Sequence, residues 1–228
     1  RYLEPERFGT YNYVISFVGL FSFLVGLGVD AILGRELILH PEKKKVLLGS
    51  GFYINTFSAL FALFIVNLGA FFLEKDPTMQ LFIFIFSLSF LLQGFGIFAT
   101  YFQSTVQAKQ NARIQVSVAV LSALLKIVGF ITSQGLLWFI SLFVVDAIIN
   151  ALWSITIFKK QGETLDWTPN IAMIKKLIIY AFPFMLSIVA VSIYMKIDQV
   201  MIARMLGQKE TGIYSVAVRL AEMWYFIP

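Results

Sequence analysis

Charged residues inside long apolar runs are the feature of this sequence that could do chemistry. A charge at the centre of a bilayer costs about 2.5–3.5 kcal/mol on insertion scales, so it usually faces the interior of a helix bundle and has a role. A lysine or arginine there is suited to contact an anion, and a carboxylate there is suited to bind a proton or a sodium ion. The candidates are Asp30, Lys126, Asp146, Lys196, Asp198, Arg219 and Glu222.

Lys126 and Asp146 fall on consecutive antiparallel spans, on either side of a turn at Gln134-Gly135. At about 1.5 Å per residue their depths differ by roughly 4–5 Å, which a lysine side chain spans easily. Two interpretations are open. The residues form a structural ion pair, or Lys126 faces a central cavity as a cation that Asp146 tunes.

The other charges also have structural alternatives. Arg219 and Glu222 are three residues apart on one helix face, so they form an intrahelical pair unless Arg219 points into the cavity as an anion contact. Asp30 lies at the end of a span, where capping at the membrane interface explains it. Snorkelling to the interface explains the charges at the end of another span, which are Lys196, Asp198 and Arg204.

No catalytic arrangement accompanies these charges. The sequence contains no Cys and one His, which excludes a disulfide scaffold and a zinc module. It has no nucleophile–His arrangement, no Gly-rich phosphate loop and no metal-ligand spacing. We therefore expect a protein that is not an enzyme and that uses no cofactor and no metal.

The composition indicates which elements hold the charges. Apolar residues make up 59% of the chain and charged residues 14%, whereas soluble domains have about 45–50% and about 25%. The chain is therefore an integral membrane protein. Its charge-free runs reach the roughly 20 residues that a spanning helix needs, and none alternates like a barrel strand. The predicted fold class is all-α, a polytopic transmembrane helix bundle.

Seven spans are predicted, the last of them truncated, with loops too short for a soluble catalytic domain. The spans cover about residues 11–33, 46–73, 80–102, 114–133, 136–158, 175–196 and 212–228. The loops 34–45, 103–113 and 159–176 carry ten Lys and Arg, against six for the loops of the other side. Because Lys and Arg collect in cytoplasmic loops, we place the first set in the cytoplasm.

An internal repeat suggests a larger plan. Arg1, Leu3, Gly9 and Tyr11 recur as Arg204, Leu206, Gly212 and Tyr214, at one offset of 203 residues (204 minus 1). Six spans separate the copies, so both run in the same direction, as in transporters built from two parallel six-helix halves. Because both ends look cut, we interpret residues 1–172 as an N-terminal half without its first helix and 173–228 as the start of a C-terminal half.

Two segments resemble a known family. The first comprises residues 3–11 (LEPERFGTY), 26–30 (GLGVD) and 35–37 (REL). The second comprises residues 198–202 (DQVMI), 205–207 (MLG), 212–215 (GIYS) and 219–228 (RLAEMWYFIP). They resemble polysaccharide-repeat-unit flippases of the Wzx type, which serve O-antigen and exopolysaccharide synthesis, in the multidrug/oligosaccharidyl-lipid/polysaccharide exporter superfamily.

The resemblance implies a protein of twelve to fourteen helices that moves undecaprenyl-pyrophosphate-linked oligosaccharides across the bacterial inner membrane for surface polysaccharides such as lipopolysaccharide. Its partners would be this lipid-linked substrate, the bilayer and the polysaccharide polymerase machinery, with no nucleic acid. Relatives line a central cavity with cations, so the expected substrate contacts are Lys126, Arg204 and Arg219. The expected coupling or structural charges are Asp30, Asp146, Asp198 and Glu222.

Two other functions stay open. A small-molecule exporter of the same fold, such as a multidrug/cation antiporter, would have more carboxylates than cations inside the bundle. A polyprenyl-dependent membrane glycosyltransferase or polymerase usually has a large external loop with catalytic carboxylates, and no such loop is visible here.

Overall fold

The computed structural model describes residues 4–164 and 167–226, and within them it contains helices and turns without any strand. The prediction of an all-α bundle is therefore confirmed. The α-helices are α1 (Pro5–Leu20), α2 (Val29–Leu39), α3 (Lys44–Leu73), α4 (Pro77–Ser87), α5 (Ser89–Gln93), α6 (Ile97–Ser104), α7 (Ala108–Ile131), α8 (Leu136–Lys160), α9 (Ile171–Met205) and α10 (Gln208–Glu222).

Six segments of the described chain are long and apolar enough to cross a membrane. They are Pro5–Leu39, Pro41–Leu73, Pro77–Ser104, Ala108–Ile131, Leu136–Lys160 and Ile171–Met205. Most extend beyond the predicted spans, because a count of apolar residues stops at the first charge whereas a helix continues through it. The seventh predicted span begins in α10, which has 15 residues, and ends at 227–228, outside the described residues. That span stays a prediction.

The first span is interrupted near its middle. Between α1 and α2 the chain forms two short 3-10 turns, and Gly26, Leu27 and Gly28 have φ angles of 73°, 49° and 71°. Glycine adopts such angles freely, whereas leucine does so at a cost in strain. The N–H of Gly26 donates to Ser58 Oγ of α3 at 2.8 Å. A neighbouring helix thus satisfies a backbone donor that the break releases inside the span.

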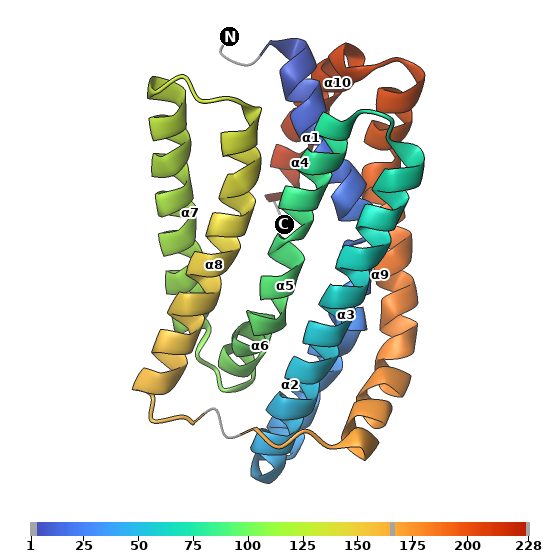
Figure 1. Cartoon of the computed structure of the whole chain (residues 1–228). Helices are drawn as coiled ribbons and strands as arrows, with labels where there is room; N and C mark the ends of the chain where they lie inside the picture. The colour runs from blue at the N-terminus through green and yellow to red at the C-terminus, as the bar shows by residue number, and fades with distance from the viewer. Residues whose placement is uncertain (1–3, 165–166, 227–228) are drawn as a thin grey trace.

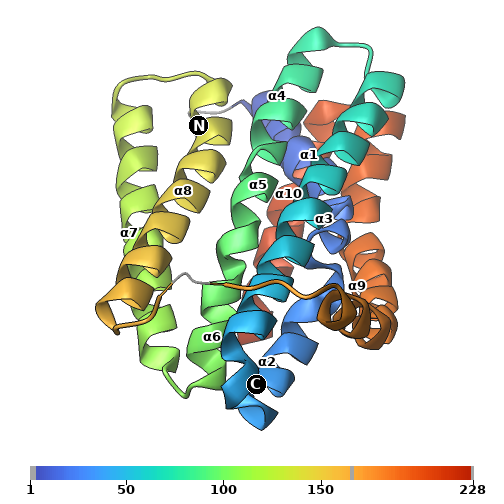
Figure 2. The same ribbon diagram turned by 60° about the horizontal axis from the view of Figure 1, so that its bottom comes forward.

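The helices form one bundle with the hairpin of α7 and α8 along one side (Figure 1). The ends of α2, α6 and α8 gather at one end of the bundle, so the loops 34–45, 103–113 and 159–176 share that end, as predicted (Figures 1 and 2). We call this the basic end. The opposite end of the bundle contains the start of α1 and the α3–α4, α7–α8 and α9–α10 turns (Figure 1).

The two copies of the predicted repeat pack against each other. A Cβ atom on Gly9 would lie 1.7 Å from the carbonyl oxygen of Gln208, and one on Gly212 would lie 2.1 Å from that of Pro5. Pro5 and Gln208 are also 203 residues apart, so they are equivalent positions of the repeat. Gly9 of the first copy therefore contacts Gln208 of the second, and Gly212 of the second contacts Pro5 of the first. Such reciprocal contacts indicate a pseudo-two-fold axis between α1 and α10.

The repeat begins at residues that the structure does not describe, because Arg1 and Leu3 lie outside the described residues. Within the described part, α9 packs against α1, α2, α3 and α10. The division of the chain into 1–172 and 173–228 stays a prediction.

Candidate functional site

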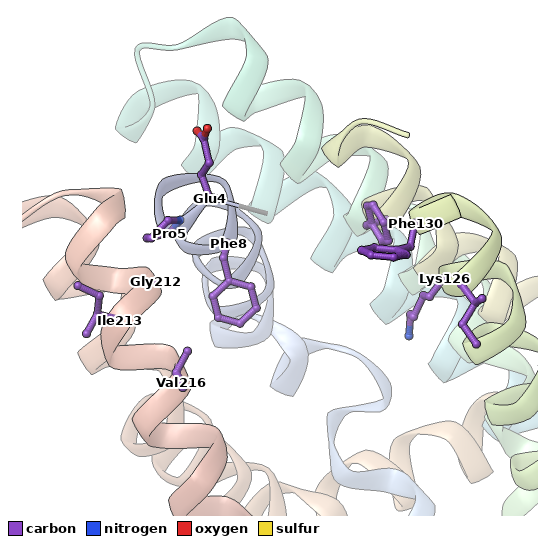
Figure 3. Close-up of a pocket in the computed structure, with 10 residues that line it drawn as sticks. Glu4, Pro5, Phe8, Lys126, Phe130, Gly212, Ile213 and Val216 are labelled. Carbon is purple, nitrogen blue, oxygen red and sulfur yellow. The ribbon is translucent and has the colours of Figure 1, made fainter. Parts of the chain in front are cut away.

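A cavity of about 890 Å³ separates the α7–α8 hairpin from α1 and α10. Its walls are apolar apart from Glu4, the residue before α1, and Lys126 of α7 (Figure 3). The remaining lining residues include Phe8, Phe130, Phe139, Ile213 and Val216. The cavity is therefore large and hydrophobic with one cationic and one anionic side chain in its wall, and an apolar pocket with a few polar groups is typical of ligand sites.

Lys126 is half-buried, and its amine projects from α7 into the space between α7 and α10 (Figure 3). Four ion pairs join described residues, and Lys126 belongs to none of them. Asp146 instead accepts a hydrogen bond from Ser122 Oγ at 2.8 Å and lines a different cavity. Of the two interpretations made from the sequence, the structure favours a lysine facing a cavity over a Lys126–Asp146 ion pair.

Arg219 lies beside the same cavity. Its guanidinium donates to Asn12 Oδ1 of α1 at 2.9 Å and stacks over the ring of Phe8, 5.0 Å from the ring centroid. Phe8 itself lines the cavity, so Arg219 contacts a residue of the cavity wall. Among the described residues no ion pair links Arg219 to Glu222, so its charge is neutralised by no carboxylate.

A polar cluster at the α1–α10 contact surrounds Arg219. Gln199 Oε1 accepts from Ser16 at 2.8 Å and from Ser215 at 3.4 Å. Asn12 and Ser215 are repeat equivalents, as are Ser16 and Arg219. The pseudo-two-fold axis therefore relates the hydrogen-bonded pair Arg219–Asn12 to the pair Ser16–Ser215, whose hydroxyls both donate to Gln199. Arg219 stands where the other copy of the repeat has a serine.

Asp198 has structural partners in the described chain. It accepts from the N–H of Gln199 at 2.7 Å and from the hydroxyl of Tyr214 at 2.5 Å. The bond from Tyr214 joins α10 to the last part of α9, whereas the bond from Gln199 lies within α9.

Arg204 also joins helices and does not line the cavity. Its guanidinium contacts Glu74 Oε1 at 2.7 Å and the carbonyl oxygen of Leu73 at 2.6 Å, and the hydroxyl of Tyr13 donates to the same Glu74 oxygen. Arg204 thus ties the end of α9 to the end of α3 and to α1. Its partner Glu74 lies far away in the sequence, so spacing gave no signal for this pair.

A second cavity, of about 430 Å³, contains the carboxylates of Asp30 and Asp146. No Lys or Arg lines it, and its other polar residues are Gln93, Gln115 and Asn150. Asp146 Oδ1 is buried without a hydrogen-bond partner in the described chain. The three amides were not among the residues expected from the sequence, because only charged residues were considered as candidates. Amide side chains within apolar spans also indicate polar contacts between membrane helices.

Asp30 lies directly after the break in the first span. Its Oδ1 accepts from Asn55 Nδ2 at 3.4 Å and from Thr100 Oγ1 at 3.5 Å, at the weak limit of hydrogen-bond geometry. Asn55 is 2% exposed, and its own Oδ1 has no partner. The Asp30 side chain is itself exposed, and these two long contacts are its hydrogen bonds to described residues. Both the capping role and the coupling role of Asp30 stay predictions.

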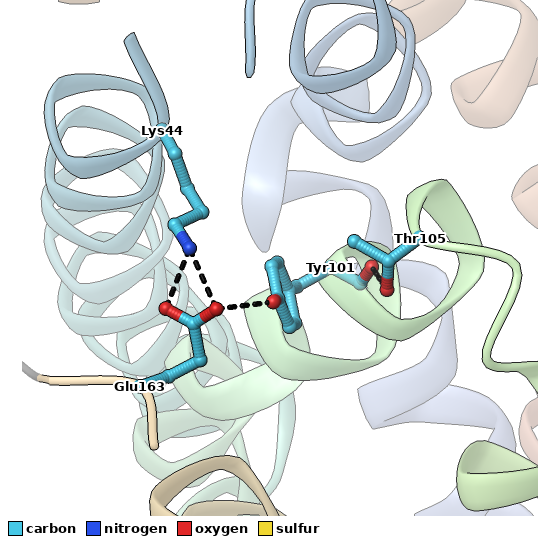
Figure 4. A network of polar contacts seen from close by, with 4 residues as sticks. All are labelled: Lys44, Tyr101, Thr105 and Glu163. Atoms are coloured by element: carbon cyan, nitrogen blue, oxygen red, sulfur yellow. Dashed lines mark hydrogen bonds and ion pairs between the residues drawn. The ribbon is translucent and has the colours of Figure 1, made fainter. Parts of the chain in front are cut away.

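A network at the basic end holds the linker between α8 and α9. Lys44 Nζ of α3 lies 2.5 and 2.6 Å from the two carboxylate oxygens of Glu163, and the hydroxyl of Tyr101 donates to one of them at 2.8 Å (Figure 4). Burial raises the pKa of Glu163, but the hydrogen bonds from Lys44 and Tyr101 outweigh it, so the pKa lies below its ordinary value. Nearby, the ring of Trp167 packs against Phe52, Phe98 and Phe158.

No group of three His, Asp or Glu side chains in the described chain is arranged to hold a metal ion.

Comparison with known proteins gives one match. The model of a family described as polysaccharide biosynthesis protein matches residues 1–225, almost the whole chain. No curated protein and no solved structure matches. Six membrane-spanning helices and this match together show that the chain belongs to the polysaccharide biosynthesis protein family, the family of the Wzx-type flippases.

Proposed function

We propose that this protein is a flippase for undecaprenyl-pyrophosphate-linked oligosaccharide repeat units, which it moves across the cytoplasmic membrane by alternating access. The observation that carries the proposal is Lys126, which forms no ion pair with any described residue and lies in the wall of a large apolar cavity between the two repeat copies and the α7–α8 hairpin. An ammonium group in the wall of an apolar cavity attracts an anion more strongly than one in bulk water, because the lower local dielectric strengthens the attraction between the two charges.

The substrate chemistry fits this cavity. The lipid tail stays in the bilayer while the pyrophosphate and the sugars cross, so the path needs cations and surfaces for sugar rings. Lys126 supplies a charge, and Arg219 supplies a second one beside the wall at Phe8. Arg204 is held by Glu74 in this conformation, so we assign it to positioning α9 rather than to substrate contact.

We also propose that Asp30 and Asp146 couple transport to a cation gradient. They share one cavity without a cationic side chain, and two carboxylates in such a place favour the uptake of a proton or sodium ion. Asp198 and Glu222 are assigned no coupling role, because Asp198 binds Tyr214 and Glu222 lines neither cavity. We place the basic end in the cytoplasm, in keeping with its excess of Lys and Arg.

The test uses the complete gene. Deleting it should cause undecaprenyl-linked single repeat units to accumulate while surface polymer is lost, and the wild-type gene should reverse both effects. Complementation with Lys126→Gln should fail, whereas Lys209→Gln, which removes an exposed charge from α10 outside the cavity, should restore polymer.

Two outcomes would overturn the proposal. Loss of both the lipid-linked intermediate and the polymer would place the protein in synthesis, as a membrane enzyme. Normal levels of both, together with greater sensitivity to cationic dyes, would instead identify a multidrug/cation antiporter of the same fold.

A further inference from the structure

A groove runs between α2 and α9 at the basic end, separate from both cavities described above. One part, of about 440 Å³, is lined by Ile32, Arg35 and Glu36 of α2 and by Lys176, Tyr180 and Phe184 of α9. An adjoining part of about 280 Å³ shares Lys176 and Tyr180 and adds Lys175. We call the combined surface the basic groove, and its defining residues are Ile32, Arg35, Lys175, Lys176, Tyr180 and Phe184.

The basic groove carries positive charge that the chain leaves unneutralised. Its one carboxylate, Glu36, is 7% exposed and binds Lys176 Nζ at 2.9 Å. Arg35 and Lys175 are exposed, and neither takes part in an ion pair with any described residue. Arg35 of α2 lines one part of the groove and Lys175 of α9 lines the adjoining part, and neither has a carboxylate partner among the described residues.

Polarity falls along the groove in the direction of the membrane interior. Lys176, Tyr180 and Phe184 follow one another at intervals of four residues on α9, about 6 Å per step. The charge of Lys176 lies nearest the helix end, the amphipathic ring of Tyr180 comes next, and the hydrocarbon ring of Phe184 lies deepest. Tyr180 also contacts Lys176, whose amine is 5.7 Å from its ring centroid. Ile32 closes the apolar side from α2.

We propose that the basic groove binds one anionic phospholipid of the adjacent leaflet. Its phosphate lies between Arg35 and Lys175, and an acyl chain lies along Tyr180 and Phe184. A basic pocket between membrane helices recognises anionic headgroups through charge, and the order from charge to hydrocarbon matches the order within a lipid. A soluble anion would gain nothing from the apolar part. The bound lipid bridges α2 and α9 at a site that the proposed transport path does not include.

The experiment uses the full-length protein purified in detergent. Binding of phosphatidylglycerol is measured by native mass spectrometry against phosphatidylcholine as a neutral reference. The test variant is Arg35→Gln/Lys175→Gln, which keeps the Lys176–Glu36 pair intact. Lys159→Gln/Lys160→Gln is the matched control, because it removes two exposed charges from the same end of the bundle, outside the groove.

We expect the test variant to bind phosphatidylglycerol about 25-fold more weakly, since each cation near a membrane surface contributes about fivefold. The control should change binding less than about twofold, because Lys159 and Lys160 lie outside the groove and salt screens charges that do not contact the bound lipid. Thermal unfolding of both variants without lipid should match the wild type, which separates loss of binding from loss of fold.

Three results would overturn the proposal. Equal weakening in both variants would mean that the overall charge of the basic end attracts the lipid. Equally strong binding of inorganic phosphate would show an anion site with no lipid specificity. Displacement of phosphatidylglycerol by a polyprenyl pyrophosphate at equimolar concentration would make the groove an entry site for the transported lipid instead.

Discussion

The contact between Gly9 and Gly212 gives the sharpest prediction, because both glycines face backbone rather than flexible side chains. Alanine at position 9 would place its Cβ 1.7 Å from the carbonyl oxygen of Gln208, and alanine at position 212 would place it 2.1 Å from that of Pro5. Ordinary contacts of this kind exceed 3.0 Å. Helices α1 and α10 would therefore have to separate by about 1 Å, which forfeits a quarter to a half of the dispersion energy between them.

We expect each substitution, Gly9→Ala and Gly212→Ala, to lower the free energy of unfolding by about 3 kcal/mol, the upper end of the usual range for overpacking. Separation would also lengthen the Arg219–Asn12 hydrogen bond between α10 and α1, now 2.9 Å. The two variants should behave alike, since the contact is reciprocal about the pseudo-two-fold axis.

The measurement is denaturant unfolding of the full-length protein in detergent, with Gly96→Ala as the matched control. Gly96 has helical backbone angles, and a Cβ there meets nothing within 4 Å. That change should be neutral or stabilising by about 0.4–1 kcal/mol. If Gly9→Ala and Gly212→Ala are as stable as this control, α1 and α10 do not make the contact described. If only one of them is destabilised, the pseudo-two-fold relation is wrong.

Four further outcomes are expected. In a lipid-linked oligosaccharide assay, Lys126→Gln should reduce the rate of flipping about 10- to 150-fold, because a charge-assisted contact contributes about 1.5–3 kcal/mol. Lys126→Arg should recover part of the lost rate. Full activity of Lys126→Gln would exclude a role of Lys126 in substrate binding. Asp146→Asn should make flipping insensitive to ionophores that collapse the proton or sodium gradient, and retained sensitivity would place coupling elsewhere. Folding lowers the pKa of Glu163, so its contribution to stability is present above pH 4.5 and is lost as the pH falls through the lowered pKa. Unfolding curves of Glu163→Gln, measured over this pH range, should lack this loss. If the variant keeps the pH dependence of the wild type, Glu163 does not stabilise the fold in this way. Arg204→Gln should cost about 1 kcal/mol of unfolding free energy, given its partly exposed pair with Glu74; unchanged stability with weakened substrate binding would return Arg204 to the transport path.

The sequence was sufficient for the fold class because membrane insertion depends on composition over short distances. Runs of apolar residues identified the six spans, and the Lys and Arg counts correctly grouped the loops that share the basic end. The repeat offset also predicted a relation between Gly9 and Gly212, though not their contact. Each of these signals is local or counts residues of one type, so no knowledge of neighbouring helices is needed.

Only the tertiary structure decided which charges meet. Lys126 and Asp146 are close enough in depth to pair, yet rotation of α7 and α8 about their own axes turns the two side chains toward different cavities. Arg204 finds Glu74, and Arg219 finds Asn12, across contacts between helices distant in the sequence. Hydropathy fixes how deep a residue lies in the membrane. The face on which it lies, and hence its partner, is set by how whole helices pack against one another.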